Sequence, residues 1–194
     1  GGKTGRSPQS LPLASFSLVM ATTDQYRLIP PLIDRMRLVL NFQFYHEHEL
    51  VEITRQRLRA LNWPVDEEVL PLIAQRSRGV PRLALRLAQA AWRVARSEGE
   101  LRITAKNLER ACLLEQLDAL GLGPLEQQYL RIVKDGTSRL NVIASRLGLP
   151  PRTVSQVTEQ FLIRMGFVDK DEHGRRFLTR KGHEHLSTSR QHDD

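Results

Sequence analysis

The last third of the chain contains the pattern that most limits its fold. A short helical pattern at 141–148 ends before Pro150 and Pro151, and a longer amphipathic pattern follows at 152–166. Because proline cannot continue a helix through its interior, these patterns indicate a helix, a turn and a second helix. Two short strand-like runs on either side of a polar turn at Gly174 come next. Helix, turn, helix and hairpin in this order predict a winged-helix module.

The second helix of this module is amphipathic, so we expect an inward apolar face and an outward polar face. In a winged helix the outward face enters the major groove of DNA, or it stays a solvated face on a module that binds protein. The inward set is Val154, Val157, Phe161 and Leu162, and the outward set is Arg152, Ser155, Gln156 and Glu159.

Basic residues gather around the predicted hairpin. Such a patch suits phosphate groups and positions a protein on nucleic acid without reading its sequence. The formal net charge of +7 modestly favours an anionic partner as well. The basic residues are Lys170 before the turn and Arg175, Arg176, Arg180 and Lys181 after it, with Asp169, Asp171 and Glu172 interrupting them.

The middle of the chain contains helical patterns with tight connections, which predict a small helical domain. We expect Asp66 to cap its second helix and Thr104 its fourth. Arg82 follows Gly79-Val80-Pro81 at the start of the third helix, where the helix dipole disfavours a cation. A bound anion would compensate there, and a solvated arginine is the alternative. The "LGLG" run at 120–123 is interpreted as a linker.

The front of the chain contains apolar runs at 15–21 and 38–44, each of which predicts a buried strand. Thr23 follows the first run, and Arg35 lies on the next loop. A hydroxyl at the end of a strand can hold a phosphate or a water, and a nearby arginine can stabilise transferring charge. Gly2-Lys3-Thr4 matches the end of a phosphate-binding loop, but the turn-forming residues after it favour a flexible loop.

The composition excludes some classes of protein. Cys112 is the single cysteine, so a disulfide scaffold is excluded and a reducing, cytoplasmic setting fits. No spacing of cysteine and histidine predicts a zinc site. No apolar run reaches the ~18 residues that a membrane-spanning helix needs, so no membrane partner is expected.

Four motifs occur together and in order: "FSLVMATTDQYRLIPPLIDRM", "FQFY", "RSRGVPRLALRL" and "TVSQVTEQFLIRMGFVDKDEHGRR". In this combination residues 8–186 resemble the RuvB family of Holliday-junction branch-migration motors, which are AAA+ ATPases. The resemblance implies a mainly α fold with a few strands. Its expected parts are a remnant of an AAA+ α/β domain at 1–45, a four-helix lid at 46–119, a winged-helix DNA-binding domain at 120–187 and a disordered tail at 188–194.

The resemblance also implies roles around ATP. Thr23 would be the sensor-1 residue that orients the attacking water, and Arg35 the arginine finger that acts on the neighbouring subunit's site. Tyr45 would pack beside the adenine, and Arg82 would be the sensor-2 residue. The P-loop and the Walker-B acid, with the site for Mg²⁺, would lie outside this chain. The chain by itself is therefore expected not to hydrolyse ATP, and Gly2-Lys3-Thr4 is a coincidence.

The remaining expectations concern partners. Lys170 and Arg175 match wing positions that touch the DNA backbone, and Arg176 and Arg152 are added as candidates from the residues. The implied partners are double-stranded DNA or a Holliday junction, further subunits in a ring expected to be hexameric, and RuvA as a candidate. The alternatives are a non-catalytic winged-helix DNA-binding regulator and another AAA+ family, such as an origin-binding or clamp-loading ATPase.

Overall fold

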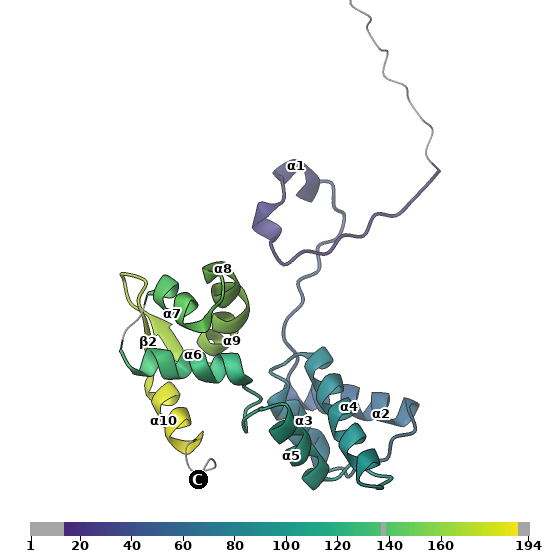
Figure 1. The fold of residues 1–194 in the computed structure, drawn as a ribbon. Coiled ribbons are helices and arrows are strands. Elements are labelled where there is room, and N and C mark those ends of the chain that lie inside the picture. Colours follow the sequence, from purple (N-terminus) through teal and green to yellow (C-terminus); the bar gives the residue numbers. More distant parts are fainter. Residues whose placement is uncertain (1–13, 137–138, 190–194) are drawn as a thin grey trace, which may run out of the picture. The chain divides into compact units, whose positions relative to one another are not determined.

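The computed structural model describes residues 14–136 and 139–189, so Gly2-Lys3-Thr4 lies outside the described part of the chain (Figure 1). The chain divides into two compact units, Gly1–Phe42 and Gln43–Asp194. In the first unit the described residues form a 3-10 turn, η1 (Gln25–Arg27), and a one-turn helix, α1 (Pro30–Ile33).

The two strands predicted at 15–21 and 38–44 do not form, so that prediction is wrong. A strand must hydrogen-bond its backbone to a neighbouring strand, and the described residues offer these segments no such partner. Their large side chains are correspondingly exposed, as at Val19 and Phe42.

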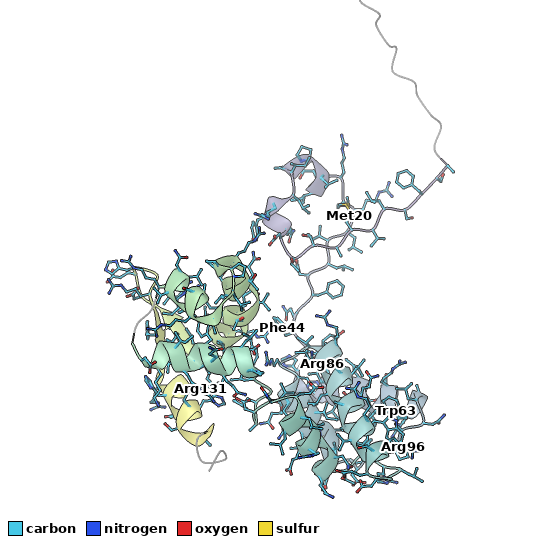
Figure 2. All side chains as sticks on the ribbon, viewed as in Figure 1. Met20, Phe44, Trp63, Arg86, Arg96 and Arg131 are labelled. Carbon is cyan, nitrogen blue, oxygen red and sulfur yellow. The ribbon has the colours of Figure 1, made fainter. Side chains whose placement is uncertain are left out.

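A helical module begins the second unit, as predicted. Its helices are α2 (Glu47–Ala60), α3 (Val69–Arg76), α4 (Pro81–Ser97) and α5 (Ala105–Leu114). They pack around one apolar core, and α4 lies against α5 while α2 lies against α3 and α4 (Figure 1). At the edge of this core Trp63 stacks on Trp92 with ring centres 5.2 Å apart, and Arg96 lies 5.7 Å from the Trp92 ring (Figure 2).

Of the two predicted N-caps, one forms in the structure. Thr104 caps α5, because its Oγ1 accepts the Asn107 amide at 3.4 Å while its own amide donates to Asn107 Oδ1 at 2.8 Å. Asp66 does not cap α3, so that prediction is wrong. Its carboxylate instead pairs with Arg102 at 3.3 Å, and its carbonyl accepts the Val69 amide in a turn that delays the helix.

A winged-helix module follows, with its own apolar core. Its elements are α6 (Pro124–Lys134), α7 (Leu140–Leu147), α8 (Pro151–Thr153), the π-helical turn η2 (Val154–Thr158), α9 (Glu159–Arg164), β1 (Val168–Lys170), β2 (Arg176–Leu178) and α10 (Arg180–Ser189). The strands β1 and β2 pair antiparallel, with Val168 opposite Leu178, which confirms the predicted hairpin. Helix α10 was not predicted, and it includes residues 188 and 189 of the expected tail; residues 190–194 lie outside the described part.

The connector between the modules is ordered. The Asp118 carboxylate accepts the amides of Leu120 and Leu122 at 2.9 and 2.8 Å, and its second oxygen lies 2.9 Å from His185 Nε2 on α10. Gly121 has a φ of +73°, and a Cβ there would overlap the Arg76 carbonyl at the end of α3. This position therefore requires glycine both for its backbone angle and for the close approach.

Candidate nucleic-acid interface

The helix predicted over 152–166 is continuous, but it contains the π-helical turn η2. A π turn inserts an extra residue, so it changes which side chains face the core. Val157 is 68% exposed although it was predicted to point inward, and Glu159 is 1% exposed although it was predicted to point outward. Both predictions are wrong for this reason. Val154 and Leu162 are buried, as predicted.

Glu159 lies at the centre of a buried network of charged groups. Arg176 donates to it through Nε at 2.9 Å and through Nη2 at 3.2 Å, and Lys170 Nζ lies 2.5 Å from Oε1. The Tyr129 hydroxyl donates to Oε2 at 3.0 Å. The network joins the second helix, both hairpin strands and α6, so it fixes the hairpin against the helices.

This network shifts the ionisation of its members. Burial raises the pKa of Glu159, but the hydrogen bonds and charges of Arg176 and Lys170 outweigh it, and the pKa lies below the ordinary 4.5. Burial, together with the Glu159 carboxylate, raises the pKa of the Tyr129 phenol above its usual range. Glu159 is therefore an anion and Tyr129 a neutral donor at neutral pH.

Two predicted DNA-contact residues take part in this network. The Arg176 side chain is 10% exposed and is also bonded to the Gly174 carbonyl at 2.7 Å, so it stabilises the hairpin. Its burial leaves little of the guanidinium for a phosphate, and a contact between Arg176 and DNA stays a prediction. Lys170 is 41% exposed, so its ammonium group reaches solvent while it is paired to Glu159.

The remaining basic residues of the hairpin region lie on the surface. Arg175 is exposed at the end of the turn, and Lys181 and Arg180 are exposed at the start of α10. The Asp171 carboxylate accepts the amides of His173 and Arg175 at 3.0 and 2.7 Å, so this acid builds the turn that presents Arg175. Arg152 is exposed on α8 and donates to Gln156 at 3.2 Å.

Two of the predicted nucleotide-binding residues lie near one loop of the helical module. The Tyr45 amide donates to the Gly79 carbonyl at 3.0 Å, and Arg82 is exposed as the second residue of α4. A Cβ at Gly79 would lie 2.9 Å from Phe44 Cβ, so the segment at 44–45 lies directly against this loop. A tyrosine whose backbone is bonded to this loop, an arginine and a helix N-terminus are groups of the kinds that suit the base and phosphates of a nucleotide.

Thr23 and Arg35 belong to the other unit. Both are exposed there, and the neighbouring Thr22 Oγ1 accepts the Asp24 amide at 3.0 Å. The described residues contain no cluster of three or more histidine, cysteine or acidic side chains that could hold a metal ion. Within residues 14–136 and 139–189, no helix is both long and apolar enough to cross a membrane.

Sequence reasoning missed the roles of Glu159, Arg78 and Arg164. Periodicity assumes regular α-helical spacing, so it could not find Glu159 beyond the π turn. Arg78 has a φ of +56°, and both arginines make contacts to residues distant in sequence. A left-handed arginine has no signature in a single sequence, whereas the turn-like "RSRGVP" run marks at least the loop that contains it.

Family models match most of the chain. The RuvB AAA lid domain matches residues 45–118, and the RuvB C-terminal winged helix domain matches residues 119–187. These boundaries agree with the two modules of the second unit.

Individual relatives are similar to this chain over most of its length. The Holliday junction branch migration complex subunit RuvB of Kosmotoga olearia is 35% identical over 193 residues, covering 97% of this chain and 56% of that protein. RuvB 1 of a Synechococcus strain is 36% identical, covering 88% of this chain and 47% of that protein. The chain thus spans about half the length of the curated relatives it matches.

A solved structure is similar as well. The Thermotoga maritima RuvB Holliday junction branch migration motor superposes with a TM-score of 0.74 at 29% sequence identity, covering 82% of this chain and 55% of that one.

Proposed function

Because the chain belongs to the RuvB family, we propose that it provides the lid and winged-helix parts of a motor subunit that moves duplex DNA at Holliday junctions. The observation that best supports this function is the adjacency of the two RuvB family domains, which together account for residues 45–187. A winged-helix regulator would need no lid before its DNA-binding module.

In this function the hairpin grips the DNA backbone. Arg175 is presented by the Asp171 turn, Lys170 reaches solvent beside it, and Arg152 is exposed on α8. These cations would neutralise phosphates and track the duplex without reading bases. Arg176 contributes indirectly, because its ion pair with Glu159 holds the hairpin in position.

The lid and the front unit would serve the nucleotide. ATP, with Mg²⁺, would supply the phosphoanhydride bond whose hydrolysis drives the cycle of the motor. Tyr45 would pack beside the adenine, and Arg82 would sense the phosphates from the start of α4. Thr23 would orient the attacking water, and Arg35 would act on the site of the neighbouring subunit, as arginine fingers do.

Further parts of the assembly are proposed from the same family membership. An arginine that acts in trans requires self-association, so we infer a ring of subunits, with six as the expected number. RuvA is the expected protein partner at the junction. A motor acting on chromosomal DNA would work in the cytoplasm.

Fluorescence anisotropy of the chain on two unrelated duplexes and a four-way junction, each titrated with salt, tests the DNA-binding part. We expect similar affinities for the duplexes, because backbone contacts do not discriminate sequence, and a steep loss of affinity with salt. Arg175→Ala should weaken binding to all three and reduce the salt slope by about one unit.

Arg110→Ala is the matched control, because it removes another exposed arginine, on α5 in the lid. It should leave the slope unchanged. A preference for one duplex of about tenfold or more, which corresponds to ~1.4 kcal/mol, would indicate base readout and favour the regulator instead.

A further inference from the structure

The loop between α3 and α4 contains an arginine whose side chain contacts residues outside the lid. Arg78 donates through Nε to the Gly121 carbonyl at 2.9 Å and through Nη2 to the same oxygen, and its Nη1 pairs with Glu126 on α6 at 2.7 Å. The side chains of Arg78 and Glu126 are only 13% and 16% exposed. Water therefore competes weakly for this ion pair, unlike a pair on an open surface.

A second arginine makes the reverse connection. Arg164, at the end of α9, donates to the Arg78 carbonyl at 2.7 Å, and its guanidinium lies 3.3 Å from the centre of the Phe44 ring. The Arg78 guanidinium lies 4.6 Å from the Phe161 ring on α9. Arg78 thus contacts an aromatic ring of the winged helix, and Arg164 contacts a ring in the segment just before the lid, which is a favourable geometry for cations.

These contacts connect modules that share little else. The lid and the winged helix have separate apolar cores, and a cavity of about 280 Å³ lies between them, lined in part by Arg86, Glu115 and Pro124. The connection is therefore made by a few directional polar contacts and by the close approach of Gly121 to the Arg76 backbone.

The same loop leads directly to the predicted nucleotide-sensing residues. Gly79, the residue after Arg78, accepts the Tyr45 amide, and Val80 and Pro81 connect it to Arg82. A single short loop therefore touches the chain beside Tyr45, the connector at Gly121 and the helix α9.

We propose that Arg78 and Arg164 are coupling residues that pass movement of the Gly79–Arg82 loop to helix α9 and the DNA-binding hairpin. That the input is a nucleotide rests on the proposed function, whereas the mechanical connection can be tested without it. Coupling between two sites is reciprocal, so DNA bound at the hairpin must also affect the loop.

The test is an NMR titration of the labelled chain with duplex DNA, following the backbone amides of Val80 and Arg82. Arg78→Asn removes the guanidinium, and asparagine tolerates the left-handed backbone better than most residues. In the unaltered chain we expect duplex binding to shift both amide resonances. In Arg78→Asn we expect unchanged duplex affinity and loss of both shifts. Glu126→Gln should act in the same direction, and Arg93→Ala, an exposed arginine on α4, should leave the shifts intact.

The outcomes separate the two proposals. Absence of the shifts in the bound, unaltered chain, or their persistence in Arg78→Asn, would overturn the coupling. If Arg78→Asn does not fold, Glu126→Gln decides in its place. If the chain does not bind duplex DNA, the proposed function fails, and ¹⁵N relaxation then decides the connection. The connection is supported if the lid and the winged helix tumble together in the unaltered chain and tumble separately in the variant. It is refuted if the variant tumbles in the same way as the unaltered chain.

Discussion

A buried carboxylate costs free energy unless cations surround it, and Glu159 has Arg176 and Lys170 as partners. The arrangement is asymmetric, because Arg176 is almost fully enclosed while Lys170 reaches solvent. Arg176 therefore depends on Glu159 for its only carboxylate partner among the described residues, whereas Lys170 can exchange that partner for an anion from solution. One acid in this way both builds the hairpin and keeps a lysine at the surface beside it.

Replacement of Glu159 by glutamine should destabilise the winged helix at neutral pH by about 3 kcal/mol, because Arg176 loses its charge partner in a buried site. The pKa of Glu159 is lower in the folded state than the ordinary 4.5. Its stabilising effect is therefore complete above about pH 4.5 and lost as the pH falls through the folded pKa. Urea unfolding at a series of pH values should show a shallower acid loss in Glu159→Gln than in the unaltered chain.

Glu67→Gln is a suitable control for that experiment. The pKa of Glu67 is also lowered, by its hydrogen bond from Arg55, but this pair lies on the open surface of the lid. It should change neutral stability little. If the free energy of unfolding fell as steeply with decreasing pH in Glu159→Gln as in the unaltered chain, protonation of Glu159 would not be the cause of the acid loss.

At the scale of elements, the π turn η2 decides how the helix over 151–164 meets the core. Regular spacing placed Val154 and Val157 on one inward face, but the structure buries only Val154 and leaves Val157 68% exposed. The exposed valine lies beside Gln156 on the outer face of the helix. The wider turn thus adds an apolar group to a surface that regular geometry would make polar.

The two valines should respond differently to truncation. Val154→Ala should cost about 2 kcal/mol, at ~0.8 kcal/mol for each buried methyl group plus a cavity. Val157→Ala, with nothing buried to lose, should stay within about 0.5 kcal/mol of the unaltered chain. Midpoints of urea unfolding measure both, and equal losses would indicate that the helix has regular α geometry in solution.

Helices and the hairpin could be predicted from local signals, because each contains its own start and stop residues. Pro81 begins α4, Thr104 caps α5, and Gly174 turns the hairpin. The local sequence at 15–21 and 38–44 could not show whether strands form there, since a strand depends on a pairing partner elsewhere in the chain. Helix α10 was not predicted because its sequence is polar: Leu186 is its one large apolar residue, and it is buried. In the candidate site, motifs proposed Arg175 and Arg82, and both are exposed in the structure. The buried ion pair of Arg176 with Glu159 could not be predicted, because it depends on tertiary contacts.

At the scale of the whole molecule, both apolar cores lie within residues 43–194, while residues 14–42 expose large apolar side chains. Exposed apolar groups of this kind favour association. The lid and the winged helix should therefore fold without the first unit, which should instead govern how the chain behaves at high concentration.

A chain that begins at Gln43 should keep the thermal unfolding midpoint and the duplex affinity of the full chain, and it should self-associate less in sedimentation velocity at rising concentration. A chain that begins at Ala14 is the control, since it retains the apolar side chains. A clear drop in the unfolding midpoint of the shorter chain would show that the first unit supports the second.

The close fit of Gly121 against the end of α3 has a consequence for how such proteins can diverge. A winged helix taken from a relative could not simply replace the native one, because Gly121, Glu126 and Arg164 would have to meet the same loop of the lid. Insertions in the connector would be selected against for the same reason. The lid loop, the connector and the end of α9 should therefore be inherited together, as one unit of evolutionary exchange that crosses the domain boundary.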